Sequence, residues 1–260
     1  MKYVILVLMV ALLNGCNPVP KTGNTQAAQA NCDTTGNPFG GGTGSVSEPW
    51  LICTVDQLKR ISGAYNVDNF KLTANLDLSA ATWVSLPGFV GKFDGQGYTI
   101  ANLSGTQGLF VQLAGGTIEN LVLTNVNVQG GSGVGAVTGY MNAGGLINSV
   151  HILSGLVKGT SKVGGIVGES YGTVAFSTSQ ATITLAGGVN SRAGGIVGIS
   201  QSGGVVTDSN ANGTVSGGTQ MGRVIGNNLG GAARCYYAGF TSSPMVPIGN
   251  NQGGADATCL

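Results

Sequence analysis

The sequence predicts an all-β solenoid, in which short parallel strands stack coil upon coil. A glycine-rich phrase recurs at nearly constant spacing, and the segment after each copy alternates apolar and polar residues. Glycine provides 47 of the 260 residues, far above the usual share of about 7 %, as expected for a fold with many tight corners. A fixed period with short strands is typical of stacked repeat architectures.

The recurring phrase sets the length of one coil. Its copies are VGAVTG from Val134, VGGIVG from Val163, AGGIVG from Ala193 and MGRVIG from Met221. QGLFVQ from Gln107, one further period upstream, fits as a degenerate earlier copy. Because each copy stands at the same place in its repeat, we expect a coil of about 28–30 residues, within the usual range of stacked repeats.

The segments between these phrases predict the strands. LVLTNVNV (121–128) and ATITL (181–185) alternate apolar and polar residues, which is the two-residue period of a half-buried strand. A single coil buries too little apolar surface to fold alone, so coils must stack on their neighbours. Inward positions should then form columns of like residues, for example Ile166, Val174, Ile196 and Val206.

Both ends of such a stack need a cap, because an open edge strand invites aggregation. Near the start, Thr54 and Gln57 form the pattern of a capping box. A short helix closed by Gly63 is expected there, with Val55, Leu58 and Ile61 on its apolar face. Near the end, residues 241–260 are expected to terminate the solenoid.

Composition excludes several classes of protein. Apolar residues make up 42 % and charged residues only 8 %, against about 25 % charged in an average domain. The apolar content excludes a disordered linker, and the lack of a strict G-X-Y period excludes collagen. The net charge of +1 without a basic run gives no sign of nucleic-acid binding. The low charge favours an extracellular protein.

The N-terminus predicts export. An apolar run from Tyr3 to Leu13 follows one lysine, which is too short for a membrane span of roughly 20 residues and is typical of a signal peptide. The ending LLNGC resembles a bacterial lipoprotein signal, so we expect residues 1–15 to be removed and Cys16 to be lipidated. Asn17 instead of Asp favours the outer membrane, and we expect residues 16–31 to form a flexible tether. The alternative is an ordinary signal peptide followed by a chance cysteine.

Four further cysteines suggest disulfides, since the count is even and the chain is expected to be exported. They allow three pairings. We prefer the two sequence-local ones, because two cysteines lie near the start of the folded part and two near its end. The absence of a CxxC pair and the presence of one histidine argue against a zinc site. The preferred pairs are Cys32–Cys53 and Cys235–Cys259.

The repeated phrases resemble a known motif. VGGIVGESYGTV (163–174) and AGGIVGISQSGGVV (193–206) are similar to the GLUG motif of bacterial surface proteins, and PWLICTVDQLKRI is similar to the lead-in that precedes such repeats. The resemblance runs from about Pro49 to Gly239. It implies a right-handed parallel β-helix in a cell-surface protein, many of which are adhesins. In the last copy Arg223 replaces a small residue, which implies a closing coil.

The resemblance and the repeats together divide the chain. We expect an N-terminal cap over residues 32–69, a GLUG-type solenoid over residues 70–240, and a C-terminal cap over residues 241–260.

Catalysis is not favoured, although parallel β-helices also include polysaccharide lyases and glycosidases. Glycosidases need two carboxylates roughly 5–10 Å apart, and the best available pair is Asp77 and Asp94, if they occupy adjacent coils. The more ordinary interpretation of Asp94 is a turn aspartate that binds its own backbone beside Gly95. His151 is expected at an ordinary strand position. No catalytic residue, metal ligand or cofactor is assigned.

Binding suits a solenoid better, because side chains of successive coils line up on long faces. The turns after each glycine-rich phrase vary most, and Tyr140, Tyr171 and Gln201 lie there. Tyrosine rings stack on sugars and anchor protein contacts. We therefore expect a surface module that binds a glycan or a protein on another surface. Loop variation without function, a structural envelope or fibre protein that forms a homo-oligomer, and an ice-binding face around Thr182 and Thr184 remain alternatives.

Overall fold

The computed structural model of the chain describes residue 32 and residues 37–80, 82–230, 232–235, 248–252 and 257–259. The expected signal peptide, Cys16 and the tether lie outside these residues, as does most of the expected C-terminal cap. Among the described segments, no helix is both long and apolar enough to cross a membrane.

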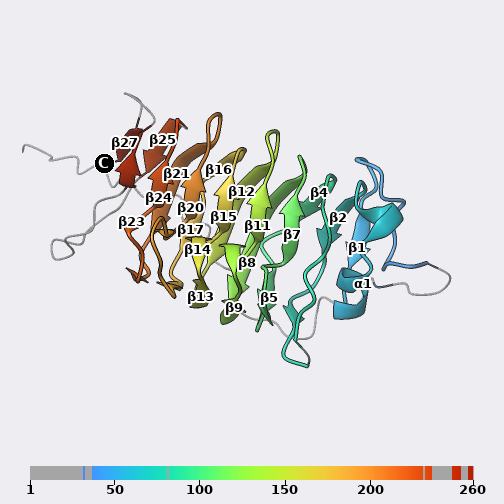
Figure 1. The fold of residues 1–260 in the computed structure, drawn as a ribbon. Helices are drawn as coiled ribbons and strands as arrows, with labels where there is room; N and C mark the ends of the chain where they lie inside the picture. Colours follow the sequence, from blue (N-terminus) through green and yellow to red (C-terminus); the bar gives the residue numbers. More distant parts are fainter. Residues whose placement is uncertain are drawn as a thin grey trace, which may run out of the picture.

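The described chain is a stack of β-coils. The coils follow one another in chain order, from the segment around α1 at one end to β25 and β27 at the other (Figure 1). All the described strand pairings between coils are parallel, and the strands form sheets of 12, 6, 5 and 4 strands that run along the stack. The predicted all-β parallel solenoid is therefore confirmed.

Sheet 1, the 12-stranded sheet, includes the longest strands. In chain order it contains β1 (Trp50–Ile52), β2 (Asn69–Leu72), β3 (Leu76–Asp77), β4 (Lys92–Asp94), β5 (Thr99–Ala101), β8 (Thr117–Thr124), β12 (Leu146–Ile152), β16 (Thr173–Ala175), β17 (Thr178–Ser179), β21 (Val205–Ala211), β25 (Ala232–Cys235) and β27 (Ala257–Cys259).

The other three sheets complete each coil. Sheet 2 contains β7 (Phe110–Leu113), β11 (Thr138–Met141), β15 (Val167–Ser170), β20 (Val197–Ser200), β24 (Ile225–Asn228) and β26 (Ile248–Asn251). Sheet 3 contains β6 (Ser104–Gly105), β9 (Val126–Gln129), β13 (Gly155–Gly159), β18 (Thr182–Leu185) and β22 (Val215–Ser216). Sheet 4 contains β10 (Ser132–Val134), β14 (Ser161–Gly164), β19 (Arg192–Gly194) and β23 (Gln220–Gly222). A full coil visits sheets 1, 3, 4 and 2 in that order, as β12, β13, β14 and β15 do.

The register of sheet 4 matches the repeat read from the sequence. Val134 pairs with Val163, Val163 with Ala193, and Ala193 with Met221. These are the first residues of the four glycine-rich phrases. The phrases therefore occupy the same position on successive coils, and the spacing from one phrase to the next is the length of one coil.

The earlier copy at Gln107 is offset by one residue from the sequence alignment. That alignment places Phe110 beside Val137, whereas β7 and β11 pair Phe110 with Thr138. Among the described strands, sheet 4 starts only at β10. The coil that contains β7 therefore reaches sheet 2 directly from β6 in sheet 3, and no described sheet-4 strand ties it to the register of the later copies.

The core changes character along the stack. Phe39, Phe70, Phe93 and Phe110 are buried in the first coils, and the ring centroids of Phe39 and Phe70 lie 5.3 Å apart. The first coil is shorter than the later ones, since its register partners are Trp50 and Phe70. In later coils aliphatic side chains fill the interior. The four positions expected to face inward, Ile166, Val174, Ile196 and Val206, are all fully buried.

The expected helix caps the first coil, but it is shorter than predicted. α1 spans Val55–Lys59, and the Thr54–Gln57 capping box is present. Leu58 and Ile61 are buried as expected. The α-helix ends at Lys59 because the Arg60 and Ile61 amides bond three residues back, and Gly63, at φ 57°, starts the 3-10 helix η2 (Gly63–Tyr65) instead of closing α1.

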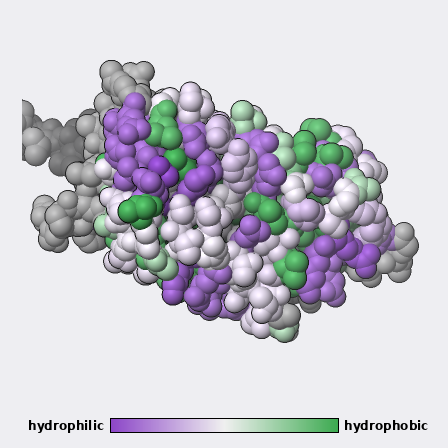
Figure 2. Space-filling view, in the orientation of Figure 1, coloured by the Kyte–Doolittle hydropathy of each residue, from purple (hydrophilic) through white to green (hydrophobic). Residues whose placement is uncertain are grey.

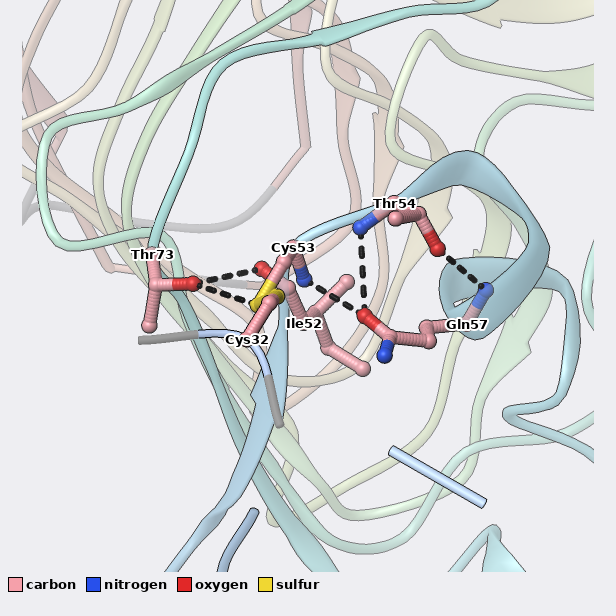
Figure 3. The surroundings of a disulfide bond; sticks show 6 residues. All are labelled: Cys32, Ile52, Cys53, Thr54, Gln57 and Thr73. Atoms are coloured by element: carbon pink, nitrogen blue, oxygen red, sulfur yellow. Dashed lines mark hydrogen bonds between the residues drawn. A yellow bond between two sulfur atoms is a disulfide. The ribbon is translucent and has the colours of Figure 1, made fainter. Parts of the chain in front are cut away.

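A disulfide fastens the chain before the first coil to the end of β1 (Figure 3). It joins Cys32 and Cys53, the first of the two pairs preferred from the sequence. The Cys53 amide donates to the Gln57 Oε1 atom at 2.8 Å, and the Thr73 hydroxyl donates to the Cys53 sulfur at 3.0 Å. Bonds to α1 and to the next coil therefore surround the bridge.

The other two cysteines lie side by side at the far end of the stack. β25 and β27 are paired so that Cys235 is the register partner of Cys259. The backbone thus places them on neighbouring strands, and the disulfide between them stays a prediction.

The surface of the viewed face is mixed. Figure 2 shows hydrophobic residues as separate spots among hydrophilic ones, with no single large apolar area among the described residues in this view. Single exposed apolar side chains of this kind are normal on a soluble surface. This face therefore gives no sign of an extended apolar contact.

Candidate binding site

Two of the sequence-predicted binding residues are in contact. Tyr140 lies in β11, and Tyr171 directly follows β15 on the next coil. Their ring centroids are 5.6 Å apart, with 50° between the ring planes. Both side chains are half-exposed. The stacking of coils therefore turns two tyrosines from successive repeats into one aromatic surface.

The third predicted residue, Gln201, is linked to this pair by a hydrogen bond to a glutamate. Glu169 in β15 is the register partner of Tyr140, and Gln201, which follows β20, donates a hydrogen bond from its side-chain amide to the Glu169 carboxylate. Tyr140, Tyr171 and Gln201 therefore come from three successive coils, and Glu169 lies next to Tyr140 in register and is bonded to Gln201. We call these three residues with Glu169 and Lys162 the tyrosine site.

Sequence reasoning missed Glu169 and Lys162 as parts of the site. Glu169 is 8 % exposed, and the Lys162 Nζ atom lies 2.6 Å from its Oε2 atom. Lys162 belongs to β14, so sheet 4 supplies the positive charge that balances a carboxylate on sheet 2. The two residues are seven apart in the sequence, and on a continuous strand this odd spacing would place them on opposite faces. The strand pattern therefore did not indicate the pair.

The electrostatics of the site keep Tyr140 protonated. The pKa of Tyr140 is raised above its ordinary value, mainly because burial disfavours the charged phenolate, and further by the hydrogen bond with Tyr171 and the nearby Tyr171 and Glu169 charges. Tyr140 therefore stays neutral at physiological pH.

Further amides lie beside the rings. Gln112 of β7, on the preceding coil, donates from its side-chain amide to the side-chain oxygen of Asn142, which follows β11, at 2.6 Å. Rings, amides and one balanced ion pair offer stacking and hydrogen bonding together.

The carboxylate pair considered for catalysis is not formed. β3 and β5 pair Asp77 with Ala101, which pairs with Thr124 of β8, whereas Asp94 of β4 pairs with Glu119 of β8. The two registers are five residues apart on β8, about 16 Å at the usual rise per residue. Asp77 and Asp94 therefore do not form the close carboxylate pair that a glycosidase needs.

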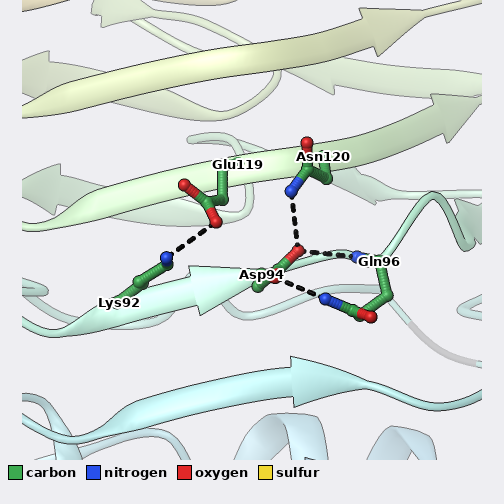
Figure 4. Close-up of polar contacts among 5 residues, drawn as sticks. All are labelled: Lys92, Asp94, Gln96, Glu119 and Asn120. Atoms are coloured by element: carbon green, nitrogen blue, oxygen red, sulfur yellow. Dashed lines mark hydrogen bonds and ion pairs between the residues drawn. The ribbon is translucent and has the colours of Figure 1, made fainter. Parts of the chain in front are cut away.

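Asp94 has a local structural role instead. Asp94 accepts a hydrogen bond at 2.9 Å from the backbone amide of Gln96, as expected of a turn aspartate, and another at 3.0 Å from the Asn120 side chain (Figure 4). Beside it, Lys92 and Glu119 form an ion pair at 2.8 Å, and the Glu119 partner raises the pKa of Lys92. The Asn120 bond and the ion pair join adjacent coils on the outer face of sheet 1.

His151 lies on the outer face of sheet 1 and is half-buried. Its Nδ1 atom is 2.9 Å from the Thr178 hydroxyl, its register partner on the next coil, while its Nε2 atom is buried without a hydrogen-bond partner among the described residues. Burial lowers the pKa of His151. Within the described ranges, no group of three or more His, Cys, Asp or Glu side chains is arranged to hold a metal ion.

The strand register around Thr182 and Thr184 also tests the alternative of an ice-binding face. Thr182 and Thr184 point to the same side of β18, but their partners on β13 are Leu156 and Lys158. Thr184 pairs with Ser216 on the other side. A flat ladder of threonines is therefore not formed around these two residues.

Comparison with known proteins relates part of the chain to immunoglobulin proteases. Residues 59–154 match the family model for the N-terminal region of the M26 IgA1-specific metallo-endopeptidases, which is less than half of the chain. An immunoglobulin A1 protease from Streptococcus sanguinis is 39 % identical over 77 residues, and one from Streptococcus pneumoniae is 31 % identical over 126 residues. These matches cover 30 % and 46 % of this chain, but only 4 % and 6 % of the proteases.

One further sequence relative and one solved structure are also similar to this chain. Halomucin from Haloquadratum walsbyi is 33 % identical over 167 residues, which cover 55 % of this chain and 2 % of halomucin. A candidate immunoglobulin A1 protease from Bacteroides ovatus superposes with a TM-score of 0.65 at 21 % identity, over 85 % of this chain and 88 % of the other. The last likeness shows a shared fold. In sequence, this chain is similar to short stretches of much longer proteins, and over residues 59–154 to the N-terminal region of the M26 peptidases.

Proposed function

We propose that this chain is an exported binding module that recognises a glycan or a protein on another surface through the tyrosine site. The observation that carries the proposal is the contact between Tyr140 and Tyr171 on adjacent coils, with ring centroids 5.6 Å apart. A pair of half-exposed rings bordered by amides is suited to stacking on a sugar or anchoring a protein contact.

Three features support a location outside the cytoplasm. The first residues have the layout of a lipoprotein signal, the chain has a disulfide between Cys32 and Cys53, and only 8 % of its residues are charged. Disulfides persist mainly in oxidising, extracytoplasmic compartments. The GLUG-like phrases and the likeness to immunoglobulin A1 proteases, whose named substrate is an antibody, agree with this location. Lipidation of Cys16 would anchor the module to the membrane.

A second candidate function is contact with immunoglobulin A1 as part of a protease-like system. The match of residues 59–154 to the N-terminal region of the M26 peptidases favours it. In that case the β-solenoid would bind or present the antibody. A carbohydrate-active enzyme is less well supported, because Asp77 and Asp94 stand apart in register. A structural envelope protein would require the long faces to be buried in a homo-oligomer.

The experiment measures binding of the purified protein to glycans, to host-surface proteins and to immunoglobulin A1. Specific binding that the double change Tyr140→Ala and Tyr171→Ala abolishes would support the tyrosine site. Phe176→Ala is the matched control, because Phe176 is an aromatic residue with 57 % exposure that lies between β16 and β17 and is not part of the tyrosine site. Binding that survives the double change would refute this site.

Two other outcomes would point to the alternatives. Cleavage of immunoglobulin A1 in the same samples would favour a protease-like role. Absence of binding to every probe would refute the binding module, and analytical ultracentrifugation would then test for the homo-oligomer that a structural protein requires.

A further inference from the structure

A groove of about 580 Å³ opens where the chain passes from sheet 1 to sheet 3. It spans several coils, since its lining comes from the segments after β3 and β5 and from the starts of β9 and β13. The residues that matter for its chemistry are Leu78, Asn102, Ser104, Asn125, Asn127 and Leu156. None of them belongs to the tyrosine site.

The amides in the groove form an oriented chain. The Asn102 side-chain nitrogen donates to the Asp77 carboxylate at 2.7 Å, and the Asn125 side-chain nitrogen donates in turn to the Asn102 side-chain oxygen. Because a carboxylate only accepts, Asp77 sets the direction of both amides. Each amide nitrogen carries a second N–H, and the Asn125 side-chain oxygen is at the open end of the chain. The groove therefore offers fixed donors and an acceptor on successive coils.

One apolar side chain, that of Leu156, lies beside these amides. Ser104, Asn127 and Leu156 are register partners on the outer face of sheet 3, and Leu156 is half-exposed there. Its neighbour Gly155 has no side chain, and a β-carbon at that position would lie 2.5 Å from the Val126 nitrogen. The backbone of Gly155 therefore packs directly against Val126, and no side chain at position 155 covers this part of the groove.

The charge of the groove is the third observation. Among the described residues, none in its lining is charged. Asp77, at one end, already accepts bonds from Asn102 and from the Ser79 amide, and these bonds lower its pKa. A charged ligand would lose hydration without meeting an opposite charge in the lining, which is costly. A neutral ligand with many hydroxyl groups meets no such cost, because each hydroxyl both donates and accepts.

From these three observations we propose that the groove binds a neutral saccharide. Its hydroxyls would bond to the Asn102 and Asn125 amides, and an apolar ring face would lie on Leu156. This inference rests on the proposed function, because it assigns a ligand class to the binding module, but it uses a surface distinct from the tyrosine site. The two surfaces can therefore be tested independently.

The test measures binding of mannotriose, galactotriose and chitotriose to the full protein by isothermal titration calorimetry, beside a sialylated trisaccharide. We expect at least one neutral sugar to bind more tightly than the sialylated one. Asn127→Trp, at an exposed strand position, would fill the groove and weaken binding at least about tenfold. Lys158→Ala is the control, since Lys158 shares a strand and a face with Leu156 but is not part of the lining.

The results separate the two proposals. Saccharide binding that is weakened by Asn127→Trp but not by Tyr140→Ala with Tyr171→Ala supports the groove. Binding weakened only by the tyrosine changes overturns the groove and leaves the proposed function intact. The groove proposal is also overturned if no neutral saccharide binds or if the protein prefers the sialylated sugar. Circular dichroism checks that Asn127→Trp is folded. If it is not, Leu156→Ala replaces it, because this change removes the apolar side chain without adding bulk.

Discussion

Gly168 lies against the backbone of Val134 on the preceding coil: a β-carbon added to Gly168 would be 2.5 Å from the Val134 nitrogen. The relationship repeats, since a β-carbon at Gly198 would be 2.7 Å from the Val163 nitrogen and one at Gly226 would be 2.7 Å from the Ala193 nitrogen. In each case a glycine of sheet 2 meets the first residue of an earlier phrase. The glycine-rich phrase therefore recurs because sheets 2 and 4 touch backbone to backbone.

Gly168→Ala should destabilise the protein by about 1–3 kcal/mol, because the added methyl group would force β15 and β10 apart. Gly188→Ala is the matched control, since a β-carbon there meets nothing within 4 Å, and it should change stability by less than about 1 kcal/mol. Urea unfolding of the two variants measures the difference. Equal stability of both would contradict close packing at Gly168.

The register of Cys235 with Cys259 leads to a second prediction. Neighbouring parallel strands lie about 4.8 Å apart, within the range of Cα separations that a disulfide requires. We expect a second bridge between these cysteines, closing a loop of about 24 residues and stabilising the protein by about 3 kcal/mol.

Peptide mapping without reduction checks this bridge directly. It should yield one linked peptide pair containing Cys32 and Cys53 and another containing Cys235 and Cys259. A variant with both Cys235→Ser and Cys259→Ser should retain only the first pair. Free thiols at Cys235 and Cys259 in the oxidised protein would refute the prediction.

Much of the fold could be predicted because equivalent positions in successive repeats become register partners in the stacked coils. Val134, Val163 and Ala193 are aligned by sequence alone, and the structure pairs them in the same way. The first coils could not be aligned so well. Their aromatic core around Phe70 and Phe93 belongs to coils without a described sheet-4 strand, so neither the spacing nor the phrase of the later coils applies to them.

The candidate site was only partly predictable. Tyr140, Tyr171 and Gln201 follow equivalent phrases, so the repeat alone places them near one another. Lys162 reaches Glu169 from another sheet of the same coil, and the spacing of the phrases does not show which side chains of sheets 4 and 2 meet. The same limit applies to Asp77 and Asp94, because the sequence does not show that their strands join sheet 1 at different positions along β8.

The predicted lipid anchor can be tested on Cys16, which lies outside the described residues. In a Gram-negative host, the wild-type protein should incorporate labelled palmitate and stay in the membrane fraction. Cys16→Ala should lose the label and the membrane association, because the lipid is the anchor. Cys32→Ala should keep both, which separates lipidation from a general effect of losing a cysteine. An unlabelled wild-type protein would favour an ordinary signal peptide.

His151 should make stability depend on pH. Burial lowers its pKa in the folded protein below the ordinary value of 6.5, so between the two pKa values the unfolded state binds more protons than the folded state. The stability that this difference provides is fully present above about pH 6.5, and it is lost as the pH falls from about 6.5 toward the folded pKa.

We therefore expect the midpoint temperature of thermal unfolding of the wild-type protein to decrease as the pH is lowered from about 7 to about 5. The fall should be smaller in His151→Gln, whose side chain does not titrate and still reaches Thr178. Carboxylates that titrate near the lower limit contribute equally to both proteins, so the difference between the two curves isolates His151. Parallel curves would show that the ring is as easily protonated in the folded chain as in the unfolded one, and would contradict its burial on sheet 1.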